Sequence, residues 1–495
     1  MKKTFHNYIP KNQTQREAKD MAQEYAKNFQ QIRNERNNSI AFLKQVGCVD
    51  ADTEYFNGTG WKRISEYTEG EKVMQYNPQN DAATLIEPIR YIKSPADTLW
   101  RICTKRGSIN QMLSLDHNFA YVTRTGLMLK RRFSEVIETH NTTKQGFSGR
   151  IKTSFSYDGE GINLTDIELR LMCAVIADGT FDKKLNICRV NLKKERKIKR
   201  LESILKESKI KYNECFKSNG YTLISFLAPR REKEFTAEWY KCSQRQLKII
   251  TDEVLHWDGY FGEGGRRRFS TTSKKSADFI QFAFSATGRR ATISEDNRIG
   301  GIHKSICYEV QISDIDKISL ATPADQEKPK IIEEKTRDGY QYCFEVETGY
   351  LVLRRGDRIF ITGNSGKTHL SIAISNKLME QGVGVRYMQY REVITHLKQN
   401  IVDEEFYQRE MSKYKNAPVL LMDDLYKGKT TESDINLVYE IINHRYLKGM
   451  PIILSCEYSV DKLLDFDEAI GSRIAEMCKG RIVEFIGTEL NDRLR

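Results

Sequence analysis

Three residues at two distant points of the chain could together cut and rejoin a peptide backbone. The Cys48 thiol can attack the carbonyl of Gly47 to form a thioester, because a thiol is the strongest nucleophile among ordinary side chains near neutral pH. The Ser365 hydroxyl can then accept the acyl group, and Asn364 can cyclise through its amide and cleave its bond to Ser365. This chemistry needs no cofactor, and it predicts that 48–364 is excised and Gly47 is joined to Ser365.

A phosphate-binding loop is split between the same two junctions. Residues 44–47 begin such a loop after a short apolar strand at 39–43, and 365–368 supply its second half in front of a helix. Joined, the halves match GxxxxGK[ST] at every fixed position except the first, where Lys44 replaces glycine. Restoration of the motif by deletion of 48–364 favours excision over an unrelated GKT sequence in a loop. The residues predicted to bind nucleotide here are Gly47, Ser365, Gly366, Lys367 and Thr368.

Two acidic residues follow the loop at a distance typical of nucleotide hydrolysis. Lys367 would reach the β- and γ-phosphates of ATP, and the Thr368 hydroxyl would coordinate Mg²⁺. Residues 419–424 read as a buried parallel strand that ends in carboxylates. We expect Asp423 to serve the metal and Asp424 to orient the attacking water.

The order of these motifs resembles the DnaC-type replicative helicase loaders of the AAA+ class. Ser455 ends a further buried strand, at the usual place of a sensor residue, and Arg473 either reaches the γ-phosphate of a neighbouring subunit or forms a surface salt bridge. The resemblance implies a homo-oligomeric ATPase whose partners are a replicative helicase and single-stranded DNA. The alternative is a nucleotide-switched DNA-replication adaptor with little turnover.

The segment 48–364 resembles the inteins, self-splicing elements with the mainly β Hint fold. Residues 48–53 resemble their N-terminal splicing block, and 358–364 resemble their C-terminal block. Residues Ser114 and His117 resemble the TxxH block, with serine in place of threonine. The resemblance implies that His117 polarises the scissile amide and protonates its leaving nitrogen.

Two positions depart from the intein pattern. Gly363 stands where the family usually has histidine, so the group that assists Asn364 must come from elsewhere. Cys343 stands where aspartate is common; it either acts in the transfer between Cys48 and Ser365 or packs in a strand.

A repeated Asp-Gly ending lies within the same segment. Residues 171–179 and 251–259 read as two buried helices that end at Asp178 and Asp258, although Glu253 stands where a small residue would pack better. Helices packed side by side would bring both carboxylates together to hold Mg²⁺ for phosphodiester hydrolysis. The pattern resembles the LAGLIDADG homing endonucleases, which implies double-stranded DNA as the substrate. The alternative is an inactive endonuclease.

The charge is compatible with contact to nucleic acid. The net charge is +12, and most of the excess lies in 48–364. Basic runs at 193–197 and 266–268 either contact phosphates or form a solvated surface. The ten cysteines form no CxxC pair, which argues against a zinc site and a disulfide framework.

The sequence therefore predicts a multi-domain chain without membrane association, in the cytoplasm of a bacterial or phage-infected cell. No apolar run is long enough to span a bilayer, and no signal peptide is evident. The predicted domains are the two parts of a split α/β phosphate-loop (AAA+) domain at 1–47 and 365–495, a mainly β Hint splicing domain at 48–158 and 319–364, and an α+β LAGLIDADG endonuclease domain at 159–318.

Overall fold

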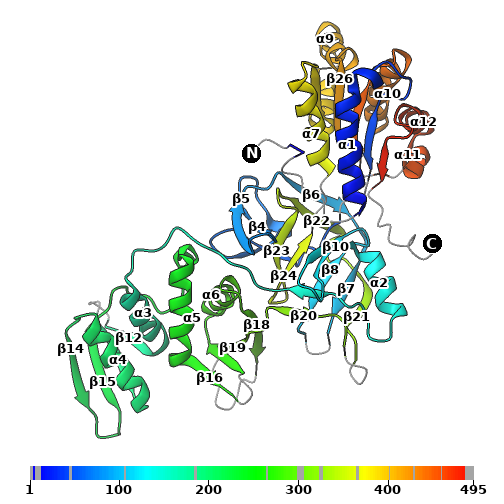
Figure 1. Cartoon of the computed structure of the whole chain (residues 1–495). Coiled ribbons are helices and arrows are strands. Elements are labelled where there is room, and N and C mark those ends of the chain that lie inside the picture. Colours follow the sequence, from blue (N-terminus) through cyan, green and yellow to red (C-terminus); the bar gives the residue numbers. More distant parts are fainter. Residues whose placement is uncertain are drawn as a thin grey trace. The chain divides into compact units, whose positions relative to one another are not determined.

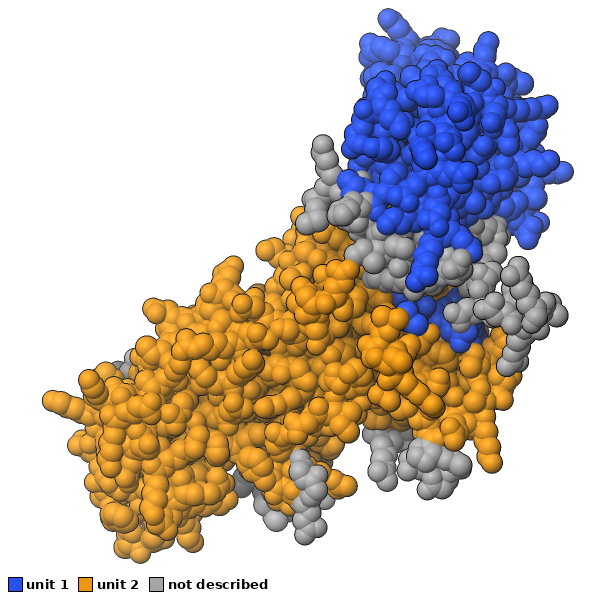
Figure 2. All heavy atoms as spheres, viewed as in Figure 1, with its two compact units in different colours: residues 1–47, 129–135, 365–495 blue, residues 48–128, 136–364 orange. Residues whose placement is uncertain are grey.

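The chain folds into two compact units, which are coloured separately in Figure 2. The first comprises Met1–Gly47, Leu129–Glu135 and Ser365–Arg495, and the second comprises Cys48–Met128 and Val136–Asn364. In this computed structural model the described residues are 4–5, 13–43, 47–104, 107–182, 187–262, 266–297, 306–322, 327–363, 367–400, 402–426, 430–456, 458 and 460–484. Among them, no helix has the length and apolar character needed to cross a membrane.

A five-stranded parallel sheet forms the centre of the first unit. Its order is β25-β26-β27-β1-β28, so β1, from the N-terminal segment, lies between two strands from the C-terminal segment. The strands are β25 (Val385–Gln389), β26 (Val419–Leu425), β27 (Ile452–Cys456), β1 (Ile40–Leu43) and β28 (Ile482–Glu484). The two segments on either side of 48–364 therefore build a single sheet.

Helices cover both faces of this sheet because its strands are apolar on both sides. Ile40 and Phe42 pack against α1 and α7, which lie next to each other in Figure 1, whereas Ala41 and Leu43 face the opposite helical layer. The helices of the unit are α1 (Gln13–Ile32), α7 (Lys367–Glu380), α8 (Tyr390–Gln399), α9 (Glu404–Lys415), α10 (Glu432–Leu447), α11 (Val460–Phe466) and α12 (Glu468–Met477).

The second unit contains a module that occurs twice in succession. Each copy runs helix, strand, strand, helix, strand, strand, and each sheet is antiparallel with its strands in the order first, second, fourth, third. The first copy is α3 (Asp166–Asp178), β12 (Gly179–Phe181), β13 (Ile187–Leu192), α4 (Glu195–Glu207), β14 (Tyr212–Phe216) and β15 (Thr222–Leu227). The second copy is α5 (Gln244–Asp258), β16 (Gly259–Phe261), β17 (Arg267–Thr271), α6 (Lys274–Ala286), β18 (Arg290–Asp296) and β19 (Cys307–Ser313).

The rest of the second unit is rich in antiparallel strands that come from both ends of its sequence. For example, β22 pairs with β6, β21 with β7, and β23 with β2. These strands are β2 (Glu54–Phe56), β3 (Trp61–Arg63), β4 (Val73–Asn77), β5 (Ala82–Ile86), β6 (Arg90–Pro95), β7 (Thr98–Cys103), β8 (Asn110–Leu113), β9 (Asn118–Val122), β11 (Arg150–Lys152), β20 (Lys317–Ser319), β21 (Lys330–Lys335), β22 (Tyr340–Glu345), β23 (Tyr350–Arg355) and β24 (Arg358–Gly363). The short elements around them are η1 (Ile64–Glu66), β10 (Met128–Arg132), α2 (Phe133–Thr142) and η2 (Ala237–Lys241), of which most of β10 and the start of α2 are grouped with the first unit.

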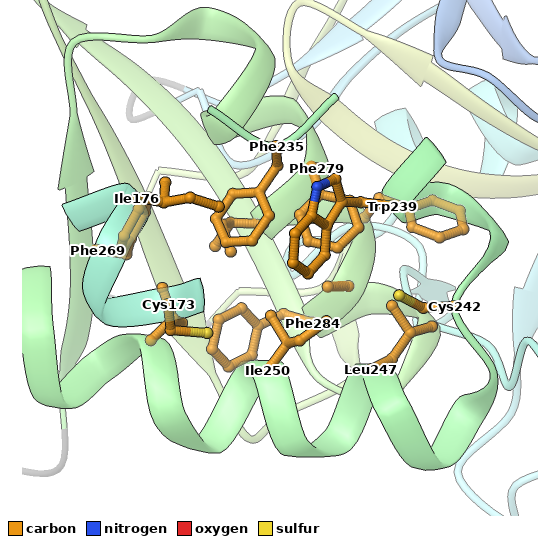
Figure 3. Close-up of a cluster of buried hydrophobic side chains, with 14 of the residues drawn as sticks. Cys173, Ile176, Phe235, Trp239, Cys242, Leu247, Ile250, Phe269, Phe279 and Phe284 are labelled. Carbon is orange, nitrogen blue, oxygen red and sulfur yellow. The ribbon is translucent and has the colours of Figure 1, made fainter. Parts of the chain in front are cut away.

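One hydrophobic core joins the strand-rich part to the repeated module. The ring of Phe56 in β2 stacks on that of Phe282 in α6, with 4.5 Å between centroids. Beside them, the buried Arg354 guanidinium pairs with Glu54 of β2 and Asp278 of α6. The part of this core shown in Figure 3 draws on α3, α5, α6, β17 and η2.

Candidate active sites

Cys48 is buried in an extended segment that lies between two other parts of the chain. On one side its amide N–H donates to Ser114 Oγ at 2.9 Å, and its carbonyl accepts from the amide of Ser114 at 3.0 Å. On the other side, Val49 and Tyr342 of β22 exchange two backbone hydrogen bonds of 2.8 Å. Ser114 therefore binds the backbone nitrogen that would leave if Cys48 attacked the preceding carbonyl.

His117 connects this region to the C-terminal end of the unit. Its amide donates to the Ser114 carbonyl at 3.0 Å, and its Nε2 is hydrogen-bonded to Thr362 Oγ1 near the end of β24. Both side chains are buried. Thr362 was missed in the sequence, where its position two residues before Asn364 was the one available signal.

Cys343 packs in β22, and its thiol donates to the carbonyl of Phe344 at 3.4 Å. It lies one residue beyond Tyr342, the strand partner of Val49. The structure thus places Cys343 in a strand and also beside the segment that contains Cys48. Both interpretations of this residue are compatible with that position.

Several predicted junction residues cannot be placed. Asn364, Ser365 and Gly366 lie outside the described residues, as do the side chains of Lys367 and Thr368. Helix α7 begins at Lys367, as the interrupted loop motif predicts. Gly47 is buried next to Cys48.

The two aspartates of the repeated module meet at a lysine. Helices α3 and α5 end at Asp178 and Asp258, and Lys197 Nζ of α4 lies 2.5 Å from Asp178 Oδ2 and 3.8 Å from Asp258 Oδ1. Glycine follows each aspartate for a steric reason: a Cβ on Gly179 would lie 2.6 Å from the Val175 carbonyl oxygen, and one on Gly259 would be closer still to that of Leu255.

Burial and the neighbouring charge of Asp178 raise the pKa of Asp258. Burial is the larger cause, followed by the charge of Asp178, and together they raise the pKa of Asp258 to about 6 against the opposing effect of Lys197. Lys233 also reaches the site and donates to the carbonyls of Val175 and Ile176 at 2.9 and 2.7 Å. Burial lowers the pKa of Lys233.

The carboxylates of Asp178 and Asp258 fit a magnesium site of the type that uses few protein ligands. Mg²⁺ commonly takes one or two carboxylates and completes its shell with water and substrate phosphates. The described residues contain no group of three or more histidines, cysteines or acids able to hold a metal alone, so a metal held by Asp178 and Asp258 would depend on water and phosphate oxygens.

The basic runs proved to have structural partners. Lys197, in the run predicted either to contact phosphates or to form a solvated surface, is buried against Asp178, so the solvated interpretation does not hold for it. Arg268 pairs with Glu309 at 2.9 Å and lies over the ring of Tyr260. The composition of the runs did not distinguish these inward contacts from free cations.

Glu253 occupies the interface between helices where the sequence favoured a small residue. Its carboxylate accepts from Arg200 at 2.7 Å, Trp257 at 2.9 Å and Arg170 at 3.0 Å. Burial alone would raise its pKa, but the hydrogen bonds from Arg200 and Arg170 outweigh it and lower the pKa. Three partners thus satisfy the buried charge of Glu253, which the sequence pattern did not reveal.

The first unit brings its predicted acidic and sensor residues together at the end of β26. Ser455 Oγ donates to Asp423 and accepts from the Asp424 amide at 2.9 Å. The Tyr387 hydroxyl, which sequence reasoning missed, donates to Asp423 Oδ2 at 3.2 Å. Asp424 has a φ of +60°, where the pairing of β26 with β27 shifts register. Such a backbone costs about 1–2 kcal/mol, and strain of this kind is concentrated at functional sites.

Arg473 lies on α12 and contacts its own subunit. Its guanidinium donates to the Ala469 carbonyl at 2.6 Å and Asn443 Oδ1 at 3.0 Å, and it lies 5.1 Å from the centroid of the Tyr439 ring. These partners are neutral groups. The predicted contact of Arg473 with the γ-phosphate bound by a neighbouring subunit stays a prediction.

The raised pKa of Asp258 should make unfolding depend on pH. Its folded pKa of about 6 exceeds the value of about 3.9 for an exposed aspartate, so stability from the bound proton is present at low pH and lost as the pH rises through 6. Asp258→Asn cannot ionise. Between about pH 4 and about pH 7.5 we expect it to gain about 1–2 kcal/mol relative to its parent, measured by urea denaturation of chains kept intact by Cys48→Ala.

Asp178→Asn provides the control for that measurement, because it removes the neighbouring negative charge while Asp258 remains buried. The pH dependence should then become smaller. A gain from Asp258→Asn that is equal at both pH values would contradict the assigned pKa.

Comparisons with known proteins cover different parts of the chain. A family model described as "IstB-like ATP binding protein" matches residues 350–469. The phage-like element PBSX protein XkdC of Bacillus subtilis (strain 168) is 37% identical over 179 residues, which is 34% of this chain and 65% of that protein. The ribonucleoside-diphosphate reductase subunit beta of Aquifex aeolicus (strain VF5) is 24% identical over 371 residues, which is 66% of this chain and 52% of that protein. The chain thus spans about half to two thirds of these relatives.

Solved structures also overlap parts of the chain. They include an AceL NrdHF class 3 split intein (9% identical, covering 64% of this chain and 98% of that chain, TM-score 0.24) and I-DmoI in complex with DNA and Mn (15% identical, covering 30% and 89%, TM-score 0.23). TM-scores of this size do not establish a shared fold. The family match identifies an IstB-like ATP-binding domain in the C-terminal part of the chain, and this part supplies four of the five strands of the parallel sheet.

Proposed function

We propose that the chain is a self-splicing precursor that excises 48–364 and joins Gly47 to Ser365. The observation that carries the proposal is the division of the structure: apart from Leu129–Glu135, which is grouped with the first unit, the two compact units divide at the two junctions where the reactive residues stand. A segment that must leave has to hold its own fold together while both of its ends stay close. Strand pairing between the two ends of the second unit meets that requirement.

The geometry around Cys48 supports a first step at the Gly47 carbonyl. Sγ of Cys48 attacks the carbonyl carbon, the bond to the Cys48 nitrogen breaks, and that nitrogen takes up a proton. Ser114 Oγ already binds this N–H and would keep the amine in place. His117 is linked to Ser114 through a backbone hydrogen bond and would supply the proton.

The later steps fall to the C-terminal junction. The Ser365 hydroxyl takes the acyl group from Cys48, either directly or through Cys343, and Asn364 cyclises to release the segment. The ester on Ser365 then rearranges to an amide. Thr362 holds the His117 ring near this junction, so the same histidine would serve both ends of the segment.

The likeness to a reductase subunit supports an inserted element. The matched 66% of the chain is more than the residues outside 48–364 provide, so the match must include part of 48–364. The C-terminal ATPase domain and a ribonucleotide reductase subunit have different chemistry. An element carried by both host proteins would account for the shared stretch.

Splicing can be tested by intact mass. The wild-type chain should yield an excised species of 48–364 and a shorter product in which Gly47 precedes Ser365, because both junctions carry their reactive groups. Cys48→Ala combined with Asn364→Ala should stay whole. The control is Cys215→Ala, which removes an exposed cysteine of β14 and should splice like wild type. If the wild type also stayed whole, the splicing residues would be misassigned or inactive.

The spliced product is proposed to be an ATPase. Ligation would complete the phosphate loop between β1 and α7, with Lys367 on the phosphates and Thr368 and Asp423 at Mg²⁺. Asp424, held through its amide by Ser455, would orient the attacking water. Its proposed partners are a replicative helicase, single-stranded DNA and further copies of itself.

Interruption of the loop should suppress nucleotide binding by the precursor. We expect the spliced product to bind ATP at least about 100-fold more tightly than the unspliced Cys48→Ala, Asn364→Ala chain, because the backbone amides that cradle the phosphates come from both junctions. Equilibrium titration with fluorescent ATP measures this difference, and equal affinities would refute it. Asp424→Asn in the spliced product distinguishes the adaptor alternative, since an adaptor would lose hydrolysis but keep its partner and function.

A second function is favoured by the paired aspartates of the repeated module. We propose that the excised segment is a Mg²⁺-dependent endonuclease for double-stranded DNA, in which Asp178 and Asp258 hold the metal. Lys197 and Lys233 would balance their charge and approach the scissile phosphate.

Nuclease activity can be read from plasmid cleavage. The excised segment should cut or nick a plasmid that encodes 1–47 joined directly to 365–495, in the presence of Mg²⁺, and Asp178→Ala should lower the rate by at least about 100-fold through loss of a metal ligand. Asp252→Ala, at an exposed position on α5, is the matched control and should cut normally. Failure of the wild type to cut any plasmid would favour the inactive alternative.

A further inference from the structure

Two cysteines adjoin the bridge that joins Val49 to Tyr342: Cys48 precedes Val49, and Cys343 follows Tyr342. Val49 and Tyr342 exchange both backbone hydrogen bonds, which makes them a hydrogen-bonded pair of an antiparallel ladder. Continuation of this antiparallel register by one residue would place Cys48 opposite Cys343. Such a pair would have no mutual hydrogen bonds; in pairs of this kind, opposing Cα atoms are typically about 4.5 Å apart and the side chains lie on the same face.

The backbone bonds on the far sides of both residues agree with this register. Cys48 turns its N–H and carbonyl toward Ser114, away from Cys343. Cys343 in turn stands opposite Ile92 in the pairing of β22 with β6. Each cysteine therefore has its polar backbone atoms directed outward, as the alternation of an antiparallel ladder requires.

The spacing suits a disulfide bond. Disulfides join residues whose Cα atoms lie roughly 4.4–6.8 Å apart, a range that includes the typical spacing of such a pair. Both side chains are buried, at 1% exposure for Cys48 and 3% for Cys343. Among the described strand pairs that have a defined register, no other cysteine stands opposite a cysteine.

We propose that Cys48 and Cys343 form a reversible disulfide that blocks excision until it is reduced. The proposal rests on the splicing role of Cys48. The oxidant is a small disulfide: one cysteine thiolate attacks it and displaces a thiol, and the second cysteine attacks the resulting mixed disulfide and displaces the other thiol. The two cysteines lose two electrons and two protons, and the oxidant becomes two thiols.

The bond would act directly on the first chemical step. A Cys48 sulfur bonded to Cys343 has no thiolate available to attack the Gly47 carbonyl. It would also remove Cys343 as a carrier of the acyl group. Reduction returns both thiols, so the precursor would splice in a reducing compartment and be held intact in an oxidising one.

The disulfide itself can be measured independently of splicing. The Asn364→Ala chain is incubated with excess oxidised dithiothreitol, whose mixed disulfide with an isolated thiol reverts by ring closure. The expected product is two hydrogens lighter and yields, after digestion without reductant, one peptide that links Cys48 to Cys343. Cys343→Ser should abolish this peptide, whereas Cys215→Ser should keep it. Free alkylation of both thiols after oxidation would overturn the proposal.

The block is measured on the wild-type chain made in a cell-free reaction. Splicing should be at least about tenfold slower with oxidised than with reduced dithiothreitol and should recover on reduction. The ratio of the two rates should approach one in Cys343→Ser, whatever its absolute rate, and stay as in wild type in Cys215→Ser. A disulfide that forms without slowing excision would overturn the block. A chain that never splices but forms the bond would instead refute the splicing function while confirming the contact.

Discussion

The second unit depends on contacts between its first residues and the strands near its C-terminal end. Val49 is held by Tyr342, and the buried carboxylate of Asp50 accepts from the guanidinium of Arg355 at 2.9–3.0 Å. A buried carboxylate and guanidinium stabilise a fold only when each satisfies the other, so loss of either partner would leave an uncompensated charge close to Cys48. These contacts fix the positions of the reactive cysteine, the Ser114 hydroxyl and the His117 ring.

The repeated module is not an independent attachment to that centre. The stacking of Phe56 on Phe282 and the ion pairs of Arg354 place the strand-rich part and the repeated module in one core. Arg354 is also the chain neighbour of Arg355, which binds Asp50. A displacement of α6 would therefore move β23, which lies close to the first residues of the segment. The proposed splicing and endonuclease sites thus depend on the same core.

Sequence patterns predicted features that depend on local periodicity. The helices that end at Asp178 and Asp258 and the apolar strand that ends in acids are of this kind, since each is encoded by neighbouring residues. Features set by distant partners were missed. Thr362 and Tyr387 owe their significance to strands far away in the sequence.

Lys197 looked like one of several free cations because a run of charges does not reveal which member turns inward with Leu201 and Leu205. Glu253 looked misplaced because its arginine partners come from other helices.

The position of β1 between two strands of the C-terminal segment determines what the insertion costs the host domain. Chain entropy penalises a longer loop only weakly, by about 0.6 kcal/mol for each doubling, so a large insertion between β1 and α7 is tolerable at equilibrium. Folding speed is more sensitive to sequence separation. The Ser39 hydroxyl bonds the amide of Ile452 across 413 residues of the translated chain, and removal of 48–364 shortens that separation to roughly 100. The cost of the insertion is therefore kinetic: β1 is made first and must wait for its neighbours β27 and β28, which are translated after the insertion.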